Sequence, residues 1–522
     1  MRPRDPSRFE TAEYDLLVVG GGIYGLTIAY DAASRGLRTA LVEASDFGSG
    51  ASFNHQKTAH GGLRTLQTGR LDRARESILE RRALARIAPW FLRPLPFLVG
   101  TYRSAFKNRL ALRIAFKVDA WLGRKRNQGV EPELHLPAAK LISKAATLRL
   151  FQGINPRGLT GSAQWYDYQL VESERLIVAF AEAADRAGAD LANYMEAVSA
   201  LKSGSRINGM RVRDRETGRE FDIRARLTVN AAGAAAGTIM TMFGVNRPFQ
   251  LLRAINLVTS KRASDIALAA PTAAGRMLTL VPWRGRAIVG TGHSETFVHP
   301  DAIDVSDAEI EAFIAEANEA FPALRLTRSD VRLVHRGVVP AIADKHGKPE
   351  LRPEPEIRDH TQDGAAGAMT VIGVKYTTAR GVAERAVTRA GKILGTRLPR
   401  SRTATTVLPG AGIADHEALA IETARAAGVE FSTAVTRHIA ALYGEASAEV
   451  VRLMLERPEL AHPVAPGCET LGAEVVHVQR KEMAIYVSDV LRRTGLAGGG
   501  DPGDEVVRRC AEIAGLPLKA GR

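Results

Sequence analysis

The stretch from 15 to 43 limits the fold of this chain more than any other part of the sequence. A short apolar run, LLVV, predicts a buried parallel strand. Gly20, Gly22 and Gly25 follow it with the spacing G-x-G-x-x-G. The first glycine then makes a tight turn, the second lets backbone N–H groups approach a pyrophosphate, and the third lets helix and strand pack closely. We therefore expect a dinucleotide-binding turn that leads into a helix at about 24–34.

A second strand, Thr39 to Val42, ends in Glu43. This order places a carboxylate at the tip of the second strand, where it can accept hydrogen bonds from both hydroxyls of an adenosine ribose. The same charge would repel a 2′-phosphate. The residues thus predict FAD or NAD as the cofactor and exclude NADP.

Length and composition limit the class of protein and the number of domains. A chain of 522 residues with 45% hydrophobic and 25% charged residues is typical of a globular protein with two or three domains. Cys468 and Cys510 cannot form a disulfide framework and show no metal-ligand spacing, so we expect no metal site and a reducing cytoplasm. The N-terminus has no apolar core, so we expect no signal peptide. The uncharged run at 227–246 contains several glycines, which favours a strand, a turn and a helix over a membrane span.

The formal net charge of +14 is concentrated in one region. Between Arg93 and Arg126 there are nine Lys or Arg residues and one acid, Asp119. The segment at 106–126 predicts a helix with a basic stripe beside an apolar face. The stripe comprises Arg109, Arg113, Lys117 and Arg124, and the face comprises Leu110, Ile114, Val118, Trp121 and Leu122. Residues 104–126 suit an anionic membrane surface, or equally an ordinary packed helix with a solvated basic rim. With only 6% aromatic residues, we expect no nucleic-acid partner.

The loop that follows Glu43 contains residues that are suited to catalysis. It is rich in Ser and Gly and contains Lys57, His60 and Arg64. A histidine next to two cations is suited to oxidising an anionic alcohol, because the imidazole can take the hydroxyl proton while a cation holds the acid group.

Here the sequence resembles a known family. The motif GGGIYG and the later run KTAHGGLR, which contains Lys57, His60 and Arg64, resemble the FAD-dependent glycerol-3-phosphate dehydrogenases, a branch of the amine and hydroxy-acid flavoprotein oxidoreductases. The resemblance implies FAD as the cofactor and His60 as the catalytic base near the flavin. It implies that Lys57 and Arg64 line the site. The cofactor contacts predicted from motif and resemblance together are Gly20, Gly22, Ile23, Tyr24, Gly25, Glu43, Ser52, Lys57, His60, Gly62, Ala232, Gly233, Gly373, Lys375, Thr377 and Thr378.

A second block, VIGVKYTTAR at 371–380, resembles the family's G-G-K-x-T-T-x-R. The resemblance places Lys375 and the threonines over flavin and substrate, and a fixed positive charge there would stabilise a reduced, anionic flavin. Arg358 resembles the family's substrate-phosphate arginine in R-D-[YH]. Val339 stands where the family has an arginine in G-V-R-P, so Arg336 is the alternative cation. The predicted substrate contacts are Arg64, Arg358, Arg336 and Thr377, and the predicted catalytic residues are His60, Lys375 and Arg64.

The substrate side departs from the family elsewhere too. Residues 254–257 replace its K-G-[ST]-H, and Gly292 and His293 replace the end of its G-T-T-D. The cofactor side is intact. FAD binding is therefore a firmer inference than the identity of the substrate.

The fold class we predict is α/β (α+β), with a two-dinucleotide-domain, Rossmann-like FAD-binding fold, a mixed-sheet substrate domain and a helical C-terminal domain. The predicted division assigns 1–90, 165–246 and 337–400 to the FAD-binding domain, 91–164 to a basic amphipathic and capping segment, 247–336 to the substrate domain and 401–522 to the C-terminal helices. One of these helices is expected to run from Glu474 to Arg492.

The function predicted from residues and resemblance is oxidation of a secondary alcohol of a small anionic polyol, with sn-glycerol 3-phosphate as the leading substrate, and transfer of the electrons to a quinone. The alternatives are an oxidase or dehydrogenase of a different hydroxy acid, polyol or amine, and a basic flavoprotein that binds RNA or has lost catalysis. A cytoplasmic location, a peripheral position on the inner face of the plasma membrane, a homodimer and another electron acceptor are further expectations.

Overall fold

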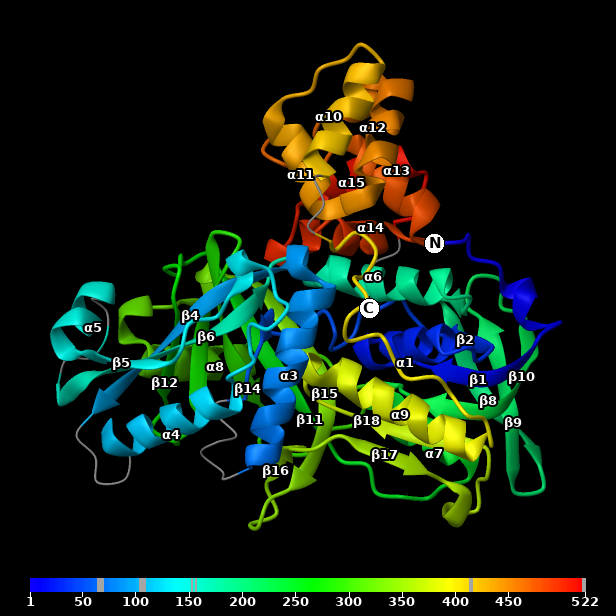
Figure 1. The fold of residues 1–522 in the computed structure, drawn as a ribbon, viewed down its shortest axis with the longest axis horizontal. Helices are drawn as coiled ribbons and strands as arrows, with labels where there is room; N and C mark the ends of the chain where they lie inside the picture. The colour runs from blue at the N-terminus through cyan, green and yellow to red at the C-terminus, as the bar shows by residue number, and fades with distance from the viewer. Residues whose placement is uncertain (63–69, 103–108, 152–153, 155–156, 413–415, 519–522) are drawn as a thin grey trace.

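The computed structural model describes residues 1–62, 70–102, 109–151, 154, 157–412 and 416–518. Two β-sheets lie side by side, and a group of helices from the C-terminal part of the chain covers one end of them (Figure 1). The chain passes between the two sheets several times, so each is assembled from distant segments. This arrangement agrees with the predicted fold class.

The first sheet contains the dinucleotide strand. Its strand order is β17-β18-β10-β1-β2-β7, with β8 and β9 attached to β10 as a hairpin. The strands are β1 (Glu13–Val19), β2 (Thr39–Val42), β7 (Asp190–Ala192), β8 (Met195–Ser203), β9 (Arg206–Asp214), β10 (Glu220–Asn230), β17 (Glu356–Asp359) and β18 (Ala368–Ile372). From β18 to β7 the neighbours are parallel, and their near-continuous apolar runs are buried on both faces.

Helices pack on this sheet. Helix α1 (Ile23–Ser34) lies between α6 (Ser173–Arg186) and α9 (Ala379–Ile393) and contacts both (Figure 1). Helix α7 (Ala236–Phe243) follows β10, so the run at 227–246 is a strand, a turn and a helix as predicted. No helix in the described part of the chain is long and apolar enough to cross a membrane.

The second sheet is mixed. Its order is β16-β15-β11-β14-β13-β12-β4-β6-β3, with β5 paired to β6. The strands are β3 (Thr58–Ala59), β4 (Leu92–Tyr102), β5 (Lys140–Ser143), β6 (Leu159–Leu170), β11 (Leu251–Thr259), β12 (Ala267–Pro271), β13 (Met277–Trp283), β14 (Arg286–His293), β15 (Val331–Ala343) and β16 (Pro349–Leu351). Because β3 belongs to the loop after Glu43, the sheet begins within the cofactor loop. Helix α8 (Asp307–Ala320), capped by Ser306, packs on it.

Two helices from the middle of the chain flank the sheets. Helix α3 (Leu71–Ile87) runs along their junction, and α4 (Arg109–Leu122) lies near the outer end of the second sheet, where both it and α5 (Lys144–Leu150) contact β5 (Figure 1). The predicted apolar face of α4 is only partly covered by the protein. Phe116 and Asp119 are buried, whereas Ile114 and Trp121 are 58% and 64% exposed. The helix therefore packs on the protein through one edge and leaves large apolar side chains outside, next to its cations.

The C-terminal helices have a core of their own. They are α10 (His416–Ala426), α11 (Thr433–Tyr443), α12 (Ser447–Glu456), α13 (Gly472–Lys481), α14 (Val487–Arg493) and α15 (Asp504–Ala514). The single helix predicted from Glu474 to Arg492 is wrong, since α13 ends at Lys481 and Met483 adopts a positive φ of 57°. Asp489 then caps α14 by accepting hydrogen bonds from the backbone N–H groups of Ile485 and Tyr486.

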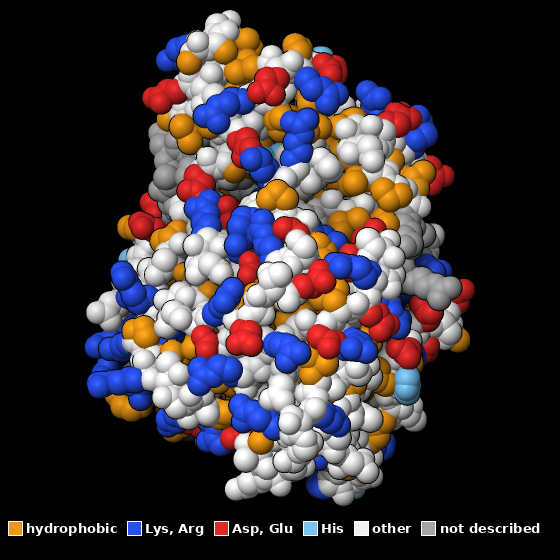
Figure 2. Space-filling model, turned by 90° about the vertical axis from the view of Figure 1, so that its right-hand side faces the viewer, with side chains coloured by type: hydrophobic (Ala, Val, Ile, Leu, Met, Phe, Trp, Pro, Cys, Tyr) orange, Lys and Arg blue, Asp and Glu red, His pale blue; other side chains and the backbone are white. Residues whose placement is uncertain are grey.

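Charges of both signs are interspersed over the face of the molecule that carries β9 and β10 (Figure 2). Cross-strand ion pairs join Arg211 to Asp222 and Arg213 to Glu220 on this face. Because both pairs are exposed, solvent screens them and they contribute little to stability. This face is therefore not a continuous cationic surface.

Candidate active site

The glycine turn between β1 and α1 leaves no room for side chains. Gly20 adopts a φ of 108°, and a Cβ on it would lie 2.6 Å from the Ala231 carbonyl oxygen. A Cβ on Gly25 would lie 1.7 Å from the Gly20 carbonyl oxygen. Gly22 caps α1 without a side chain, and Ser52 Oγ accepts a hydrogen bond from Ile23 N at 3.0 Å. The positive end of α1 therefore meets an open cradle of the kind that receives a pyrophosphate.

Glu43 lies beside this turn, at the tip of β2. Its Oε2 accepts a hydrogen bond from Gly21 N at 2.6 Å, and its Oε1 accepts one from Ser45 N at 2.8 Å. Burial raises the pKa of the carboxyl, and these backbone donors oppose the shift. The sequence did not predict these two contacts. Each carboxylate oxygen retains acceptor capacity, so the geometry still fits a ribose hydroxyl.

One cavity of about 3860 Å³ connects the glycine turn to the loop histidine and to the late lysine. The predicted site residues that line it are Gly20, Gly22, Ile23, Tyr24, Glu43, Ser52, His60, Gly62, Ala232, Gly233, Arg336, Gly373, Lys375 and Thr377. Thr377 Oγ1 accepts a hydrogen bond from His60 N at 3.0 Å, which joins two segments that are 317 residues apart. Predicted cofactor and substrate residues therefore meet in one place.

His60 is held by a buried carboxylate. Its Nδ1 lies 3.2 Å from Asp167 Oδ2, and its Nε2 lies 2.8 Å from Thr58 Oγ1. Because Asp167 is an acceptor when ionised, the neutral imidazole carries its proton on Nδ1 and keeps the Nε2 lone pair. The His60 side chain is 48% exposed, on the cavity side. A histidine oriented in this way can accept a proton through Nε2.

Asp167 has three further donors around it. They are Gly61 N at 2.6 Å, Trp165 Nε1 at 3.1 Å, and the Arg81 guanidinium, which forms a buried ion pair. Burial opposes ionisation, but Arg81 and the hydrogen bonds outweigh it and hold the pKa of Asp167 below its ordinary value. Sequence reasoning gave Asp167 no role, although it follows an aromatic pair in a strand. Only the pairing of β3 with β6 shows that it reaches His60.

Lys57, a predicted cofactor contact, is held by protein groups in this structure. Lys57 is fully buried, and its Nζ lies 2.9 Å from Glu174 Oε1 and 2.7 Å from the Phe53 carbonyl oxygen. It does not line the cavity. Burial opposes ionisation of both partners. The pKa of Glu174 nevertheless falls to about 2 because Lys57 and Arg284 are close, so we treat the pair as ionised. Lys57 fixes the loop that carries His60.

Arg358 is also placed away from the cavity. It forms a two-bond ion pair with Asp363, which contacts His360 Nδ1 at 2.8 Å. His360 Nε2 in turn contacts Thr370 Oγ1 at 2.8 Å. This network holds the hairpin of β17 and β18, and Asp363 engages Arg358, which was predicted to contact substrate. Arg352, six positions earlier, lines the cavity.

Two other predicted contacts lie behind the cavity wall. Gly25 packs against the glycine turn, and Thr378 Oγ1 donates to the Lys375 carbonyl oxygen at 3.4 Å. Neither lines the cavity. They support the residues that do. Arg64 lies outside the described residues.

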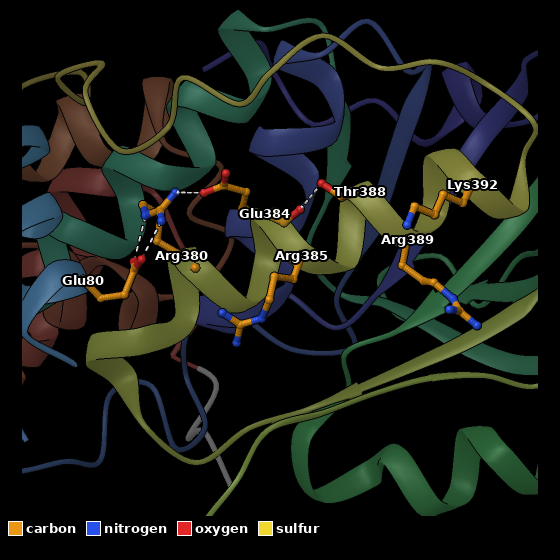
Figure 3. A pocket seen from close by; sticks show the side chains of 8 residues that line it. Glu80, Arg380, Glu384, Arg385, Thr388, Arg389 and Lys392 are labelled. Atoms are coloured by element: carbon orange, nitrogen blue, oxygen red, sulfur yellow. Dashed lines mark hydrogen bonds and ion pairs between the residues drawn. The ribbon is translucent and has the colours of Figure 1, made fainter. Parts of the chain in front are cut away.

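The last arginine of the late motif, Arg380, points away from the cavity. A separate groove of about 500 Å³ runs along the outer face of α9, and Arg380 lies at its end between Glu80 and Glu384 (Figure 3). A Cβ on Gly381 would lie 2.5 Å from Glu80 Oε1. The ion pair therefore clamps α3 against α9, and its role is structural.

A glycine cradle, a carboxylate at the tip of β2 and a histidine–aspartate pair in one cavity are the features of a dinucleotide-dependent oxidoreductase, and the family model below identifies it as a flavoprotein. Comparison with known proteins agrees. Residues 15–388 match the family model "FAD dependent oxidoreductase", and residues 401–520 match "C-terminal domain of alpha-glycerophosphate oxidase". The chain belongs to the FAD-dependent glycerol-3-phosphate dehydrogenase and oxidase family.

Its relatives include glycerol-3-phosphate dehydrogenase of Synechocystis sp., 30% identical over 94% of this chain and 90% of that protein. The mitochondrial glycerol-3-phosphate dehydrogenase of Homo sapiens is 31% identical over 97% of this chain and 71% of that protein. The crystal structure of glycerol-3-phosphate dehydrogenase from Bacillus halodurans, complexed with FAD, has the same fold. Its TM-score is 0.75, at 24% identity, covering 98% of this chain and 92% of that one. The cofactor of this chain is FAD.

Proposed function

We propose that this flavoenzyme oxidises the secondary alcohol of a small anionic polyol, with sn-glycerol 3-phosphate oxidised to dihydroxyacetone phosphate as the leading reaction. One observation carries the proposal. His60, oriented by Asp167, opens into the same cavity as the glycine turn and Lys375. FAD held by the glycine turn and Glu43 would be the two-electron oxidant for the carbinol carbon.

The residues of the chain handle the proton. His60 Nε2 accepts the hydroxyl proton of the substrate in place of its hydrogen bond with Thr58. The Asp167 carboxylate then stabilises the imidazolium, because its charge is fixed by Arg81 and lies 3.2 Å from Nδ1. Lys375, which also lines the cavity, contributes a positive charge.

Two arginines are suited to the anionic end of the substrate. Arg336 lines the cavity, and its side chain pairs with exposed Asp304 at 3.3 Å. Arg352 also lines it, pairs with Glu356 at 3.1 Å, and has a buried Nε without a partner in the described part of the chain. A guanidinium with a free N–H can bind phosphate at little cost. Arg352 thus replaces Arg358 in the proposal.

The acceptor proposed is a membrane quinone. The cavity continues along β4, past Val99 and Thr101, to Leu112 and Phe116 of α4. The exposed Ile114 and Trp121 of this helix lie beside exposed Arg113, Lys117 and Arg124. Apolar side chains among cations suit the surface of an anionic bilayer, where a quinone would be within reach.

Anaerobic mixing of the FAD-loaded protein with polyol phosphates and hydroxy acids tests the substrate. Sn-glycerol 3-phosphate should bleach the flavin absorbance faster than glycerol or lactate. No bleaching by any phosphate ester would refute the proposal. Co-sedimentation with anionic liposomes at low salt tests the membrane contact, and neutral liposomes are the control.

A further inference from the structure

An amide in the cavity wall has an atom without a partner. Gln56 Oε1 accepts a hydrogen bond from Thr279 Oγ1 at 2.7 Å, while its buried Nε2 has no partner in the described part of the chain. Turning the amide over would exchange the two atoms and still leave one unpaired. An unpaired buried amide is costly, so such a group indicates a ligand that completes it.

A second amide lies close by. Asn256 Oδ1 accepts a hydrogen bond from Thr291 Oγ1 at 2.9 Å. A Cβ on Gly290 would lie 1.9 Å from Asn256 Oδ1 and 2.8 Å from Gln56 Nε2, so both amides converge on this glycine. Gln56, Asn256, Thr279 and Thr291 all line the cavity that contains His60. These residues come from three strands of the second sheet, β11, β13 and β14, and from the loop that follows Glu43.

The side chains next to Gln56 in the cavity wall are also uncharged. His55 Nδ1 accepts a hydrogen bond from Lys57 N at 3.0 Å, which leaves the ring proton on Nε2. Burial and nearby Lys57 hold the pKa of His55 well below its ordinary value. Its ring stacks on Tyr376 with centroids 4.6 Å apart. His55 Nε2 and the Tyr376 hydroxyl are buried without partners among the described residues, so several neutral groups face the same cavity.

The chemistry of this wall differs from that of a phosphate site. Amides and hydroxyls match the donors and acceptors of a neutral hydroxyl group, whereas phosphate is bound best by arginine. Val339, which replaces an arginine of the family motif, also lines the cavity. We propose that Gln56, with Asn256, Thr279 and Thr291, forms a subsite for a free hydroxyl group of the substrate next to the oxidised carbinol.

This inference rests on the proposed function and narrows its substrate class. The substrate carries at least one free hydroxyl besides the one that is oxidised. Polyol phosphates therefore bind better than their deoxy analogues or simple hydroxy acids of the same length.

Calorimetric binding to the oxidised, FAD-loaded protein separates this inference from turnover. The two probes are dihydroxyacetone phosphate and hydroxyacetone phosphate, which differ by one hydroxyl. Wild type should bind the first about tenfold more tightly. Gln56→Met, which keeps the side-chain length, should bind both equally. Gln362→Met, the same change at an exposed position outside the cavity, should keep the wild-type ratio.

An unchanged ratio in Gln56→Met would overturn the inference while leaving the proposed function intact. If Gln56→Met loses FAD affinity but keeps the wild-type ratio of the two probe affinities, Gln56 contacts the cofactor. That result would also overturn the inference. If wild type binds neither probe and no polyol phosphate bleaches its flavin, both the inference and the proposed function fail. Thr279→Val, which removes the partner of Gln56 and keeps the volume, should reduce the ratio in the same direction.

Discussion

Replacing Asp167 with Asn tests whether the buried carboxylate prepares His60 for proton transfer. The change keeps the shape of the side chain. The asparagine oxygen can still accept from Gly61 N and Arg81, which leaves the NH2 group facing His60 Nδ1 and Trp165 Nε1. A donor opposite Nδ1 moves the imidazole proton to Nε2. The atom that should accept the substrate proton then carries one.

The size of the effect follows from this loss. General base catalysis contributes about 10²-fold to 10⁴-fold, or about 2.7–5.4 kcal/mol of activation free energy. Asp167→Asn should therefore slow anaerobic flavin reduction by at least about 10²-fold. FAD should still bind, because the substitution leaves the glycine turn, Ser52 and Glu43 unchanged. The assay is stopped-flow bleaching at saturating substrate, with the flavin spectrum recorded first.

Stability needs a separate control. The same substitution weakens a buried ion pair, and leaving one partner unpaired costs about 3–5 kcal/mol. Asp363→Asn is the matched control, since Asp363 also joins a histidine, His360, to an arginine, Arg358, but lies outside the cavity. It should lower the unfolding temperature and leave the reduction rate unchanged. A folded Asp167→Asn protein that reduces its flavin at the wild-type rate would refute the reasoning.

Further substitutions probe other parts of the site. Lys375→Met should leave FAD bound and slow flavin reduction by about tenfold or more, measured by the same bleaching assay. Gly25→Ala should give a colourless protein, since its Cβ would meet a carbonyl oxygen at 1.7 Å, and a yellow product would contradict the cradle. Glu174 contributes stability above its unfolded pKa of about 4.3, and this is lost as the pH falls through its folded pKa of about 2. Glu174→Gln should therefore destabilise the protein at neutral pH by about 3–5 kcal/mol, and a denaturant series should show less loss between pH 5 and 2 than in wild type. Trp121→Glu should abolish co-sedimentation with anionic liposomes and keep flavin reduction; equal sedimentation would exclude this surface.

Local sequence determined the cofactor side of this protein. A glycine turn between a strand and a helix has few conformations available, so Gly20, Gly22 and Gly25 specify the cradle from spacing alone. Glu43 follows from strand length, and His60 and Lys375 follow from short motifs with recognisable neighbours. Each of these features depends on residues within about thirty positions of each other.

The tertiary structure decided what depends on strand pairing. Asp167 reaches His60 only because β3 pairs with β6, and Gln56 reaches Thr279 across 223 positions. Lys57 and Arg358 were predicted to contact ligands. In the structure they form ion pairs with Glu174 and Asp363. Whether a cation faces a cavity or a partner depends on register and packing between distant segments. Motif spacing holds no information on register or on packing between distant segments. The cavity wall that contains Gln56 and Thr279 could therefore be assigned only from the folded chain.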